Sequence, residues 1–131
     1  MKLKQYIFTT ITTVGIVVLS TMPIPENPPL GDVPLIDKWV HMVMYAGLAF
    51  LMWVDHVVRS KRQYTWMVRC IMALYAFLLG GLMELVQAYL TTCRSGDWID
   101  FEADAIGAVL GVAICMGFDR LKIKGKVKNE K

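Results

Sequence analysis

Carboxylates crowd into one short stretch of this chain, residues 84–111, between two strongly apolar segments. The charged residues of this stretch are Glu84, Arg94, Asp97, Asp100, Glu102 and Asp104. Lys38 and His41 occur earlier, where another apolar segment begins. Carboxylates and a histidine can exchange protons, and they can pair with cations or hold a polar head group. The question is which elements bring them together.

Four apolar segments must position these residues: 6–22, 39–58, 66–90 and 101–118. Each approaches the length of about 20 residues that a helix needs to cross a bilayer. A helix is expected because lipid offers no hydrogen-bond partners to the backbone, and a helix satisfies these groups internally. The chain has 131 residues, 56% of them hydrophobic and only 19% charged. We therefore predict an all-α, four-helix transmembrane bundle, with a single domain over 1–131 and a basic tail at 119–131.

The first apolar segment has an alternative interpretation as a signal peptide, because Lys2 and Lys4 precede it. However, it runs into Met22-Pro23-Ile24-Pro25 without a small-x-small cleavage site. A retained span is the favoured prediction.

The distribution of charge predicts the orientation. Twelve of the 14 lysines and arginines fall on one side of the predicted spans, and eight of the 11 acids fall on the other. Basic loops stay in the cytoplasm. Both termini are therefore predicted to be cytoplasmic, with the acids on the outer face, where Lys38 and Arg94 are the two basic residues.

Helical spacing aligns several polar and small residues on shared faces. Three sets are expected: Asp37, His41 and Tyr45 on the second span; Glu84 and Gln87 on the third; Asp100, Asp104, Gly107 and Gly111 on the fourth. A carboxylate inside a span costs about 2.5 kcal/mol or more unless it faces the bundle interior. We therefore expect Glu84, Asp104 and His41 to converge near Lys38 and Arg94, with the glycines allowing close helix packing.

A purely structural interpretation remains open for the same residues. Asp97 and Asp100 can cap the fourth helix, and Asp37 can cap the second. A buried ion-pair cluster can also hold helices together. At the opposite end, interfacial snorkelling would explain His56, which stands beside Asp55.

Several other classes of site are not indicated. Cys70, Cys93 and Cys115 have no metal-ligand or CxxC spacing, and there is no HExxH motif, so we predict no metal and no cofactor. The basic tail lacks interleaved aromatic residues, so we predict no nucleic-acid partner.

The ordered set of motifs resembles the VanZ-like family over about residues 10–118. The matching residues are Leu19-Ser20-Thr21-Met22-Pro23, Asp37-Lys38-Trp39-Val40-His41, Tyr45, Glu84-x-x-Gln87, Arg94, and Asp100-x-x-x-Asp104-x-x-Gly107-x-x-x-Gly111. The resemblance implies a small multi-pass protein of the bacterial inner (cytoplasmic) membrane, with its polar motif on the outer face. The founding member is associated with low-level resistance to the glycopeptide teicoplanin. The family often has Asn where this chain has Asp104, so this carboxyl is either protonated or paired with Arg94 or Lys38.

Two functions follow as predictions. The first is an envelope accessory protein that binds the head group of a membrane lipid or lipid-linked envelope precursor in an outward-facing pocket. Its predicted binding residues are Asp37, Lys38, His41, Tyr45, Glu84, Gln87, Arg94, Asp97, Asp100 and Asp104. The alternative is an intramembrane acid/base hydrolase or transferase acting on a lipid-linked substrate, with Glu84, Asp104 and His41 as candidate catalytic residues and metal assistance conceivable. Transport is disfavoured because the acids stop in the outer half.

Overall fold

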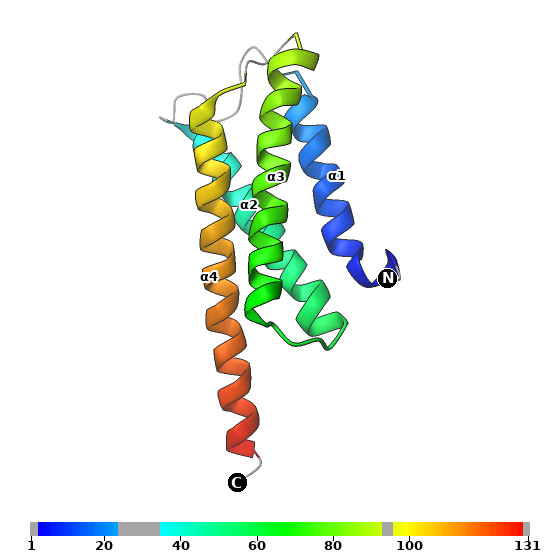
Figure 1. Ribbon diagram of the computed structural model, residues 1–131, viewed down its shortest axis with the longest axis vertical. Coiled ribbons are helices and arrows are strands. Elements are labelled where there is room, and N and C mark those ends of the chain that lie inside the picture. The colour runs from blue at the N-terminus through cyan, green and yellow to red at the C-terminus, as the bar shows by residue number, and fades with distance from the viewer. Residues whose placement is uncertain (1–2, 24–34, 93–95, 130–131) are drawn as a thin grey trace.

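The computed structural model describes residues 3–23, 35–92 and 96–129, and every regular element within those ranges is helical (Figure 1). A short 3-10 turn, η1 (Leu3–Tyr6), leads into α1 (Ile7–Thr21). Helix α2 (Ile36–Trp53) continues as a π-helical segment, η2 (Val54–Arg59). Helices α3 (Trp66–Leu90) and α4 (Trp98–Asn129) complete the fold. The predicted all-α class with four helices is confirmed.

Three helical segments are long and apolar enough to cross a membrane: Ile36–Arg59, Trp66–Leu90 and Trp98–Ile123. Their outward faces carry large apolar side chains that the protein leaves exposed, such as Leu78, Leu85 and Val109. Helix α1 is apolar as well but has only 15 residues. Length and composition therefore suggest a membrane protein.

Helices α2 and α4 pack most closely, through small residues. A Cβ atom on Gly107 would collide with the carbonyl of Met42, and one on Gly111 would lie 2.7 Å from the carbonyl oxygen of Ala46. The expected close approach at these two glycines is confirmed, because any side chain there would separate the two helices.

Local signals explain most helix boundaries. Thr65 caps α3, which has the predicted bounds, by accepting a hydrogen bond from the Val68 N–H. Asp97 caps α4 in the same way by accepting from the Ile99 N–H at 3.0 Å, as expected. Asp100 instead lies within the first turn of α4, so a cap at Asp100 was a wrong expectation.

Two other boundaries differ from the prediction. Helix α2 begins at Ile36 after Leu35, whose φ is 57°, and Asp37 lies inside the first turn. The prediction that Asp37 caps α2 was therefore wrong. Helix α4 runs beyond 118 to Asn129, because the basic tail contains no proline and several good helix formers.

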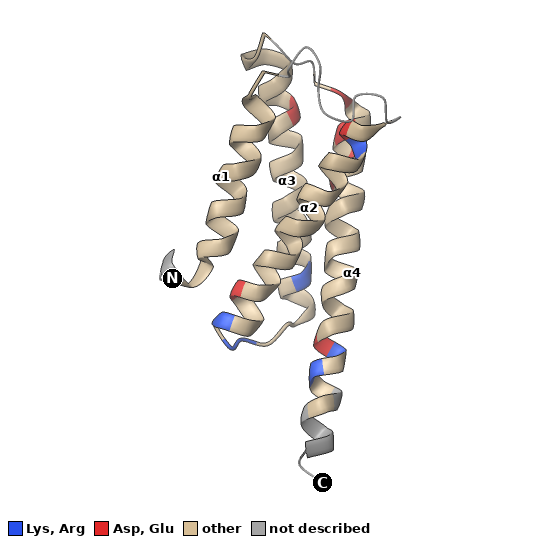
Figure 2. Cartoon of the chain, turned by 180° about the vertical axis from the view of Figure 1, so that it is seen from behind, with Lys and Arg blue, Asp and Glu red and all other residues tan. Residues whose placement is uncertain are grey.

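Charge separates towards the two ends of the bundle (Figure 2). One end, called the acidic end below, carries Glu84, Asp97, Asp100 and Asp104, with Lys38 among them. The other, the basic end, is the end of the bundle at which η1 and the α2–α3 connection lie and past which α4 extends (Figure 1). Its basic residues are Arg59, Lys61, Arg62, Arg69, Arg120 and Lys122.

At the basic end, Asp55 and His56 are buried, so the snorkelling interpretation was wrong. The Asp55 carboxylate accepts hydrogen bonds from the N–H and hydroxyl of Thr9, at 2.8 and 2.9 Å, and from Arg59 at 3.1 Å. His56 bonds to the Tyr6 hydroxyl and the Gln63 carbonyl oxygen. Helix α1 and the 3-10 turn before it pack over this position and supply partners that local sequence does not reveal.

Candidate functional site

Side chains from three helices meet at the acidic end. His41 of α2, Glu84 of α3 and Asp104 of α4 are 4%, 7% and 1% exposed. One potential ligand atom of each residue lies within 4.8 Å of those of the other two. These three residues are called the buried cluster below.

A short hydrogen bond fixes the histidine. The Nδ1 atom of His41 lies 2.8 Å from Oδ1 of Asp104. With Asp104 ionised, the carboxylate accepts and Nδ1 donates, which leaves Nε2 with the lone pair if the ring is neutral. This arrangement orients the imidazole as a base or a metal ligand.

Glycines make room for the buried cluster. A Cβ atom on Gly80, one turn before Glu84 on α3, would lie 2.9 Å from Oδ2 of Asp104. The absence of a side chain at Gly80 therefore lets this carboxylate lie directly against α3. Sequence reasoning missed Gly80, although its position one turn from Glu84 was a usable signal.

Glu84 also ties α3 to the start of α4. Its Oε2 atom accepts a hydrogen bond from the backbone N–H of Asp97 at 2.7 Å. A Cβ atom on the preceding residue, Gly96, would lie 2.7 Å from the Glu84 carbonyl oxygen. One oxygen of the Glu84 carboxylate is thus occupied by the fold itself.

Other buried polar atoms in and beside the buried cluster make no hydrogen bond to a described residue. Within ranges 3–23, 35–92 and 96–129, no hydrogen-bond partner reaches Oε1 of Glu84, Oδ2 of Asp104 or the hydroxyl of Tyr45. An unsatisfied buried polar atom costs about 1–3 kcal/mol. Open atoms on three neighbouring helices are what a ligand, a water molecule or a cation would satisfy.

Lys38 lies closer to the end of the bundle and is already paired. Its ammonium group lies 2.9 Å from Oδ2 of Asp97 and also contacts Asp100, which joins α2 to the start of α4. The lysine and the Ile99 N–H hold the pKa of Asp97 below its usual value by bonding its charged form. Lys38 is therefore engaged by these two acids.

The remaining predicted site residues are placed differently. The Gln87 amide is buried and donates to the Ser20 carbonyl at 3.0 Å, so it ties α3 to α1. Glu102 is exposed. Arg94 lies outside the described residues, and its pairing stays a prediction.

A cavity of about 170 Å³ adjoins the buried cluster at His41. Its lining comes from α1 and α2: Leu19, Ser20, Asp37, Val40, His41 and Met44. Half of these side chains are apolar and half polar. The cavity therefore suits a molecule that has both characters.

A histidine and two carboxylates are also a donor set that divalent transition metals accept. No metal was predicted because the sequence has no short-range ligand motif, whereas these three candidate ligands stand at positions 41, 84 and 104 of three helices. No described contact tests that prediction. It stays a prediction.

No protein-family model, curated protein or solved structure matches this chain. The class of this protein is therefore described from its own structure. It is an all-helical protein with three helices of membrane-spanning length and a buried His-Glu-Asp cluster at the acidic end.

Proposed function

We propose that this chain is a VanZ-like protein of the bacterial cytoplasmic membrane that spans it four times, with the acidic end outside. The gathering of basic residues at the opposite end supports this orientation. Helix α1 is the fourth span, although its 15 residues reach only about 22 Å at 1.5 Å per residue. The motif resemblance of the sequence supports the family assignment.

We propose further that the acidic end binds the head group of a membrane lipid or of a lipid-linked envelope precursor. The observation that carries this proposal is the cavity between α1 and α2, which pairs an apolar lining with His41 of the buried cluster. An amphiphile can place its head group at the polar side chains while its hydrocarbon chain remains in the bilayer. Polar groups inside spans are functional candidates by default.

The open atoms favour particular head groups. Glu84 and Asp104 each present an acceptor oxygen without a described partner, which suits hydroxyl or amine donors. A phosphate would have to compete with Asp97 and Asp100 for Lys38. The described residues therefore favour a sugar- or amine-bearing head group.

Native mass spectrometry of the detergent-extracted protein tests this binding function. We expect a lipid of defined mass on the wild type, reduced about tenfold or more in Glu84→Gln, because the amide turns an acceptor into a donor. The matched control is Glu102→Gln, an exposed acid on α4. Lipid retention that is equal in both variants, or a wild type that carries only bulk membrane lipids, would contradict the proposal.

The association of the VanZ-like family with teicoplanin resistance suggests a test in cells. If the bound molecule is an envelope precursor, expression of the wild type in a susceptible bacterium should raise the teicoplanin concentration that stops growth. Glu84→Gln should lose this effect while Glu102→Gln keeps it. Equal protection by both variants would show that resistance does not depend on the buried cluster.

An intramembrane hydrolase or transferase is the second candidate function. The observation that favours it is the Nδ1–Asp104 bond, which orients His41 as a base beside Glu84. With a metal ion, the same three residues would supply ligands and leave a position for water. Incubation of the purified protein with its co-purified lipid, with and without a chelator, tests this function. A bound lipid that is never converted would exclude it.

A further inference from the structure

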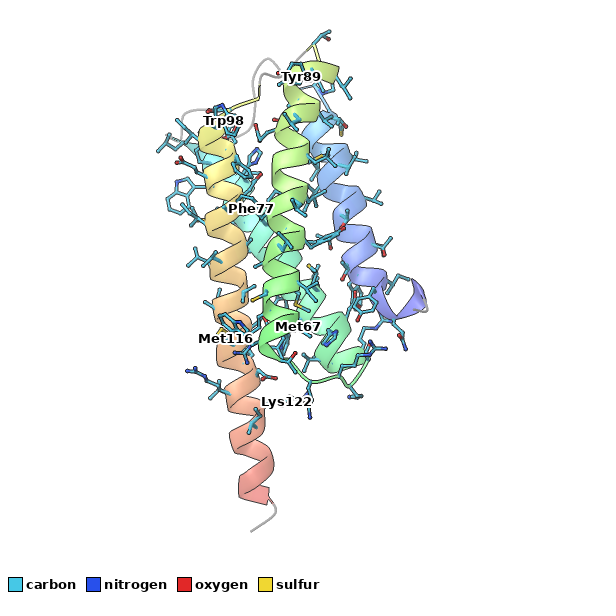
Figure 3. The ribbon with its side chains drawn as sticks, in the orientation of Figure 1. Met67, Phe77, Tyr89, Trp98, Met116 and Lys122 are labelled. Carbon is cyan, nitrogen blue, oxygen red and sulfur yellow. The ribbon has the colours of Figure 1, made fainter. Side chains whose placement is uncertain are left out.

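A second pocket, of about 560 Å³, lies at the basic end between the α2–α3 connection and α4. Its volume falls within the range of about 300–1,000 Å³ typical of small-molecule sites. Its aromatic and charged lining residues are Lys61, Arg62, Tyr64, Arg69, Asp119 and Lys122. Figure 3 shows Lys122 on α4 and Met67 at the start of α3 at this same end of the bundle.

Positive charge dominates this pocket, with four basic side chains and one acid. Among the described residues, no ion pair joins any of these four to a carboxylate. The acid nearest in sequence to the connection, Asp55, is used by Thr9 and Arg59 instead. Repulsion between gathered cations is relieved when an anion binds.

Arg69 and Tyr64 give the pocket a fixed wall. The Arg69 guanidinium donates to the Tyr64 carbonyl at 3.0 Å and lies over the Tyr64 ring, 5.0 Å from its centre. Both the Nε atom of Arg69 and the hydroxyl of Tyr64 are buried without a hydrogen-bond partner in the described part of the chain. Burial raises the pKa of Tyr64 to about 12, so its hydroxyl keeps its proton at neutral pH.

The connection that carries Lys61 and Arg62 is held in place by the helix before it. The Arg62 N–H donates to the His56 carbonyl at 3.1 Å, and the His56 ring bonds to the Gln63 carbonyl at 3.2 Å. Lys61 adopts a left-handed φ of 55° in this turn. The pocket also lies at the N-terminus of α3, where the helix dipole favours an anion.

We propose that this pocket binds a phosphate group, carried either by an anionic lipid head group or by a water-soluble phosphate ester. Guanidinium groups match phosphate oxygens in pairs, and ammonium groups add charge without strict geometry. Open N–H and O–H donors on Arg69 and Tyr64 add to the four basic side chains, and Asp119 is the one acid in the lining. This site is separate from the buried cluster and does not depend on its function.

Binding measurements on the purified, delipidated chain test the proposal. The probes are dioctanoyl phosphatidylglycerol, dioctanoyl phosphatidylcholine and glycerol 3-phosphate. The test variant is Arg62→Gln with Lys122→Gln, and the matched control is Arg120→Gln, which removes an exposed charge on α4 outside the pocket lining. All three positions are exposed, so the variants should fold.

We expect the wild type to bind phosphatidylglycerol at least tenfold more tightly than phosphatidylcholine. The double variant should lose about tenfold or more of this affinity, and Arg120→Gln less than about twofold. Displacement of the lipid by glycerol 3-phosphate would identify a water-soluble ester as a ligand source, and failure of displacement would identify the lipid. Equal losses in the double variant and the control, or no preference for the anionic probes over zwitterionic phosphatidylcholine, would overturn the proposal.

Discussion

Each end of this bundle buries a carboxylate beside a histidine, and the two sites differ in how completely the protein satisfies them. At the basic end, Asp55 is fully buried and receives hydrogen bonds from Thr9 and Arg59. At the acidic end, Asp104 has one oxygen bonded to His41, and no described residue reaches the other. A complete hydrogen-bond shell indicates a structural role, whereas an open one leaves capacity for a ligand.

Because the Asp55 carboxylate is the more completely hydrogen-bonded of the two, we expect replacement of Asp55 to have the largest effect on stability. Asp55→Ala leaves the two Thr9 donors without their acceptor, and we expect the free energy of unfolding to fall by about 3 kcal/mol. Equilibrium unfolding in mixed micelles measures this change, with Glu102→Ala as the exposed control. A loss below about 1 kcal/mol would show that Asp55 does not hold α1 against η2.

The next effect in size concerns the close approach of α2 and α4. Gly107→Ala places a methyl group against the Met42 backbone and should lower the free energy of unfolding by about 2 kcal/mol. We expect this variant to lose lipid retention at the buried cluster as well. Gly117 on the same helix has open space around it, so Gly117→Ala should be neutral or slightly stabilising. Thermal unfolding in detergent compares the two. Equal melting temperatures would contradict the packing described above.

A smaller effect on stability is expected at the acidic end itself. Asp104→Asn keeps an oxygen that can accept from Nδ1 of His41, so the free energy of unfolding should change by less than about 1 kcal/mol. The same micelle unfolding assay checks this value. A loss as large as that of Asp55→Ala would show that Asp104, like Asp55, mainly stabilises the fold.

The smallest effect is a pH dependence at Asp97. Lys38 and the Ile99 N–H lower its folded pKa, so its contribution to stability is complete above the unfolded value of about 3.9. That contribution is lost as pH falls through the lower, folded pKa. The difference in stability between the wild type and Asp97→Asn should therefore shrink below about pH 4. A difference that stays constant from pH 7 to pH 3 would contradict the ion pair with Lys38.

Periodic features of this fold were predictable from the sequence. The bounds of α3, the inward stripe that contains His41 and Tyr45, and the close packing at Gly107 and Gly111 all follow from helical spacing. Helical spacing places these residues on one face of their own helix. The inward orientation of that face follows from its polar or small side chains.

The expected convergence of His41, Glu84 and Asp104 is found, but several individual contacts between helices were missed. The bonds from Thr9 to Asp55 and from Gln87 to Ser20 join residues far apart in sequence, so nothing local distinguishes them. The space that Gly80 leaves for Asp104 is hidden for the same reason. The burial of His56 beside Asp55 was missed because α1 and the turn before it supply hydrogen-bond partners from another segment.

Lipid retention at the two ends tests the central claim most directly. Native mass spectrometry should compare Glu84→Gln with Asp55→Asn, both purified as folded protein under the same conditions. We predict that Glu84→Gln loses the bound lipid with little loss of stability, while Asp55→Asn is less stable and keeps the lipid. Full lipid occupancy in Glu84→Gln, or its loss only in Asp55→Asn, would contradict the assignment of the buried cluster as the binding site.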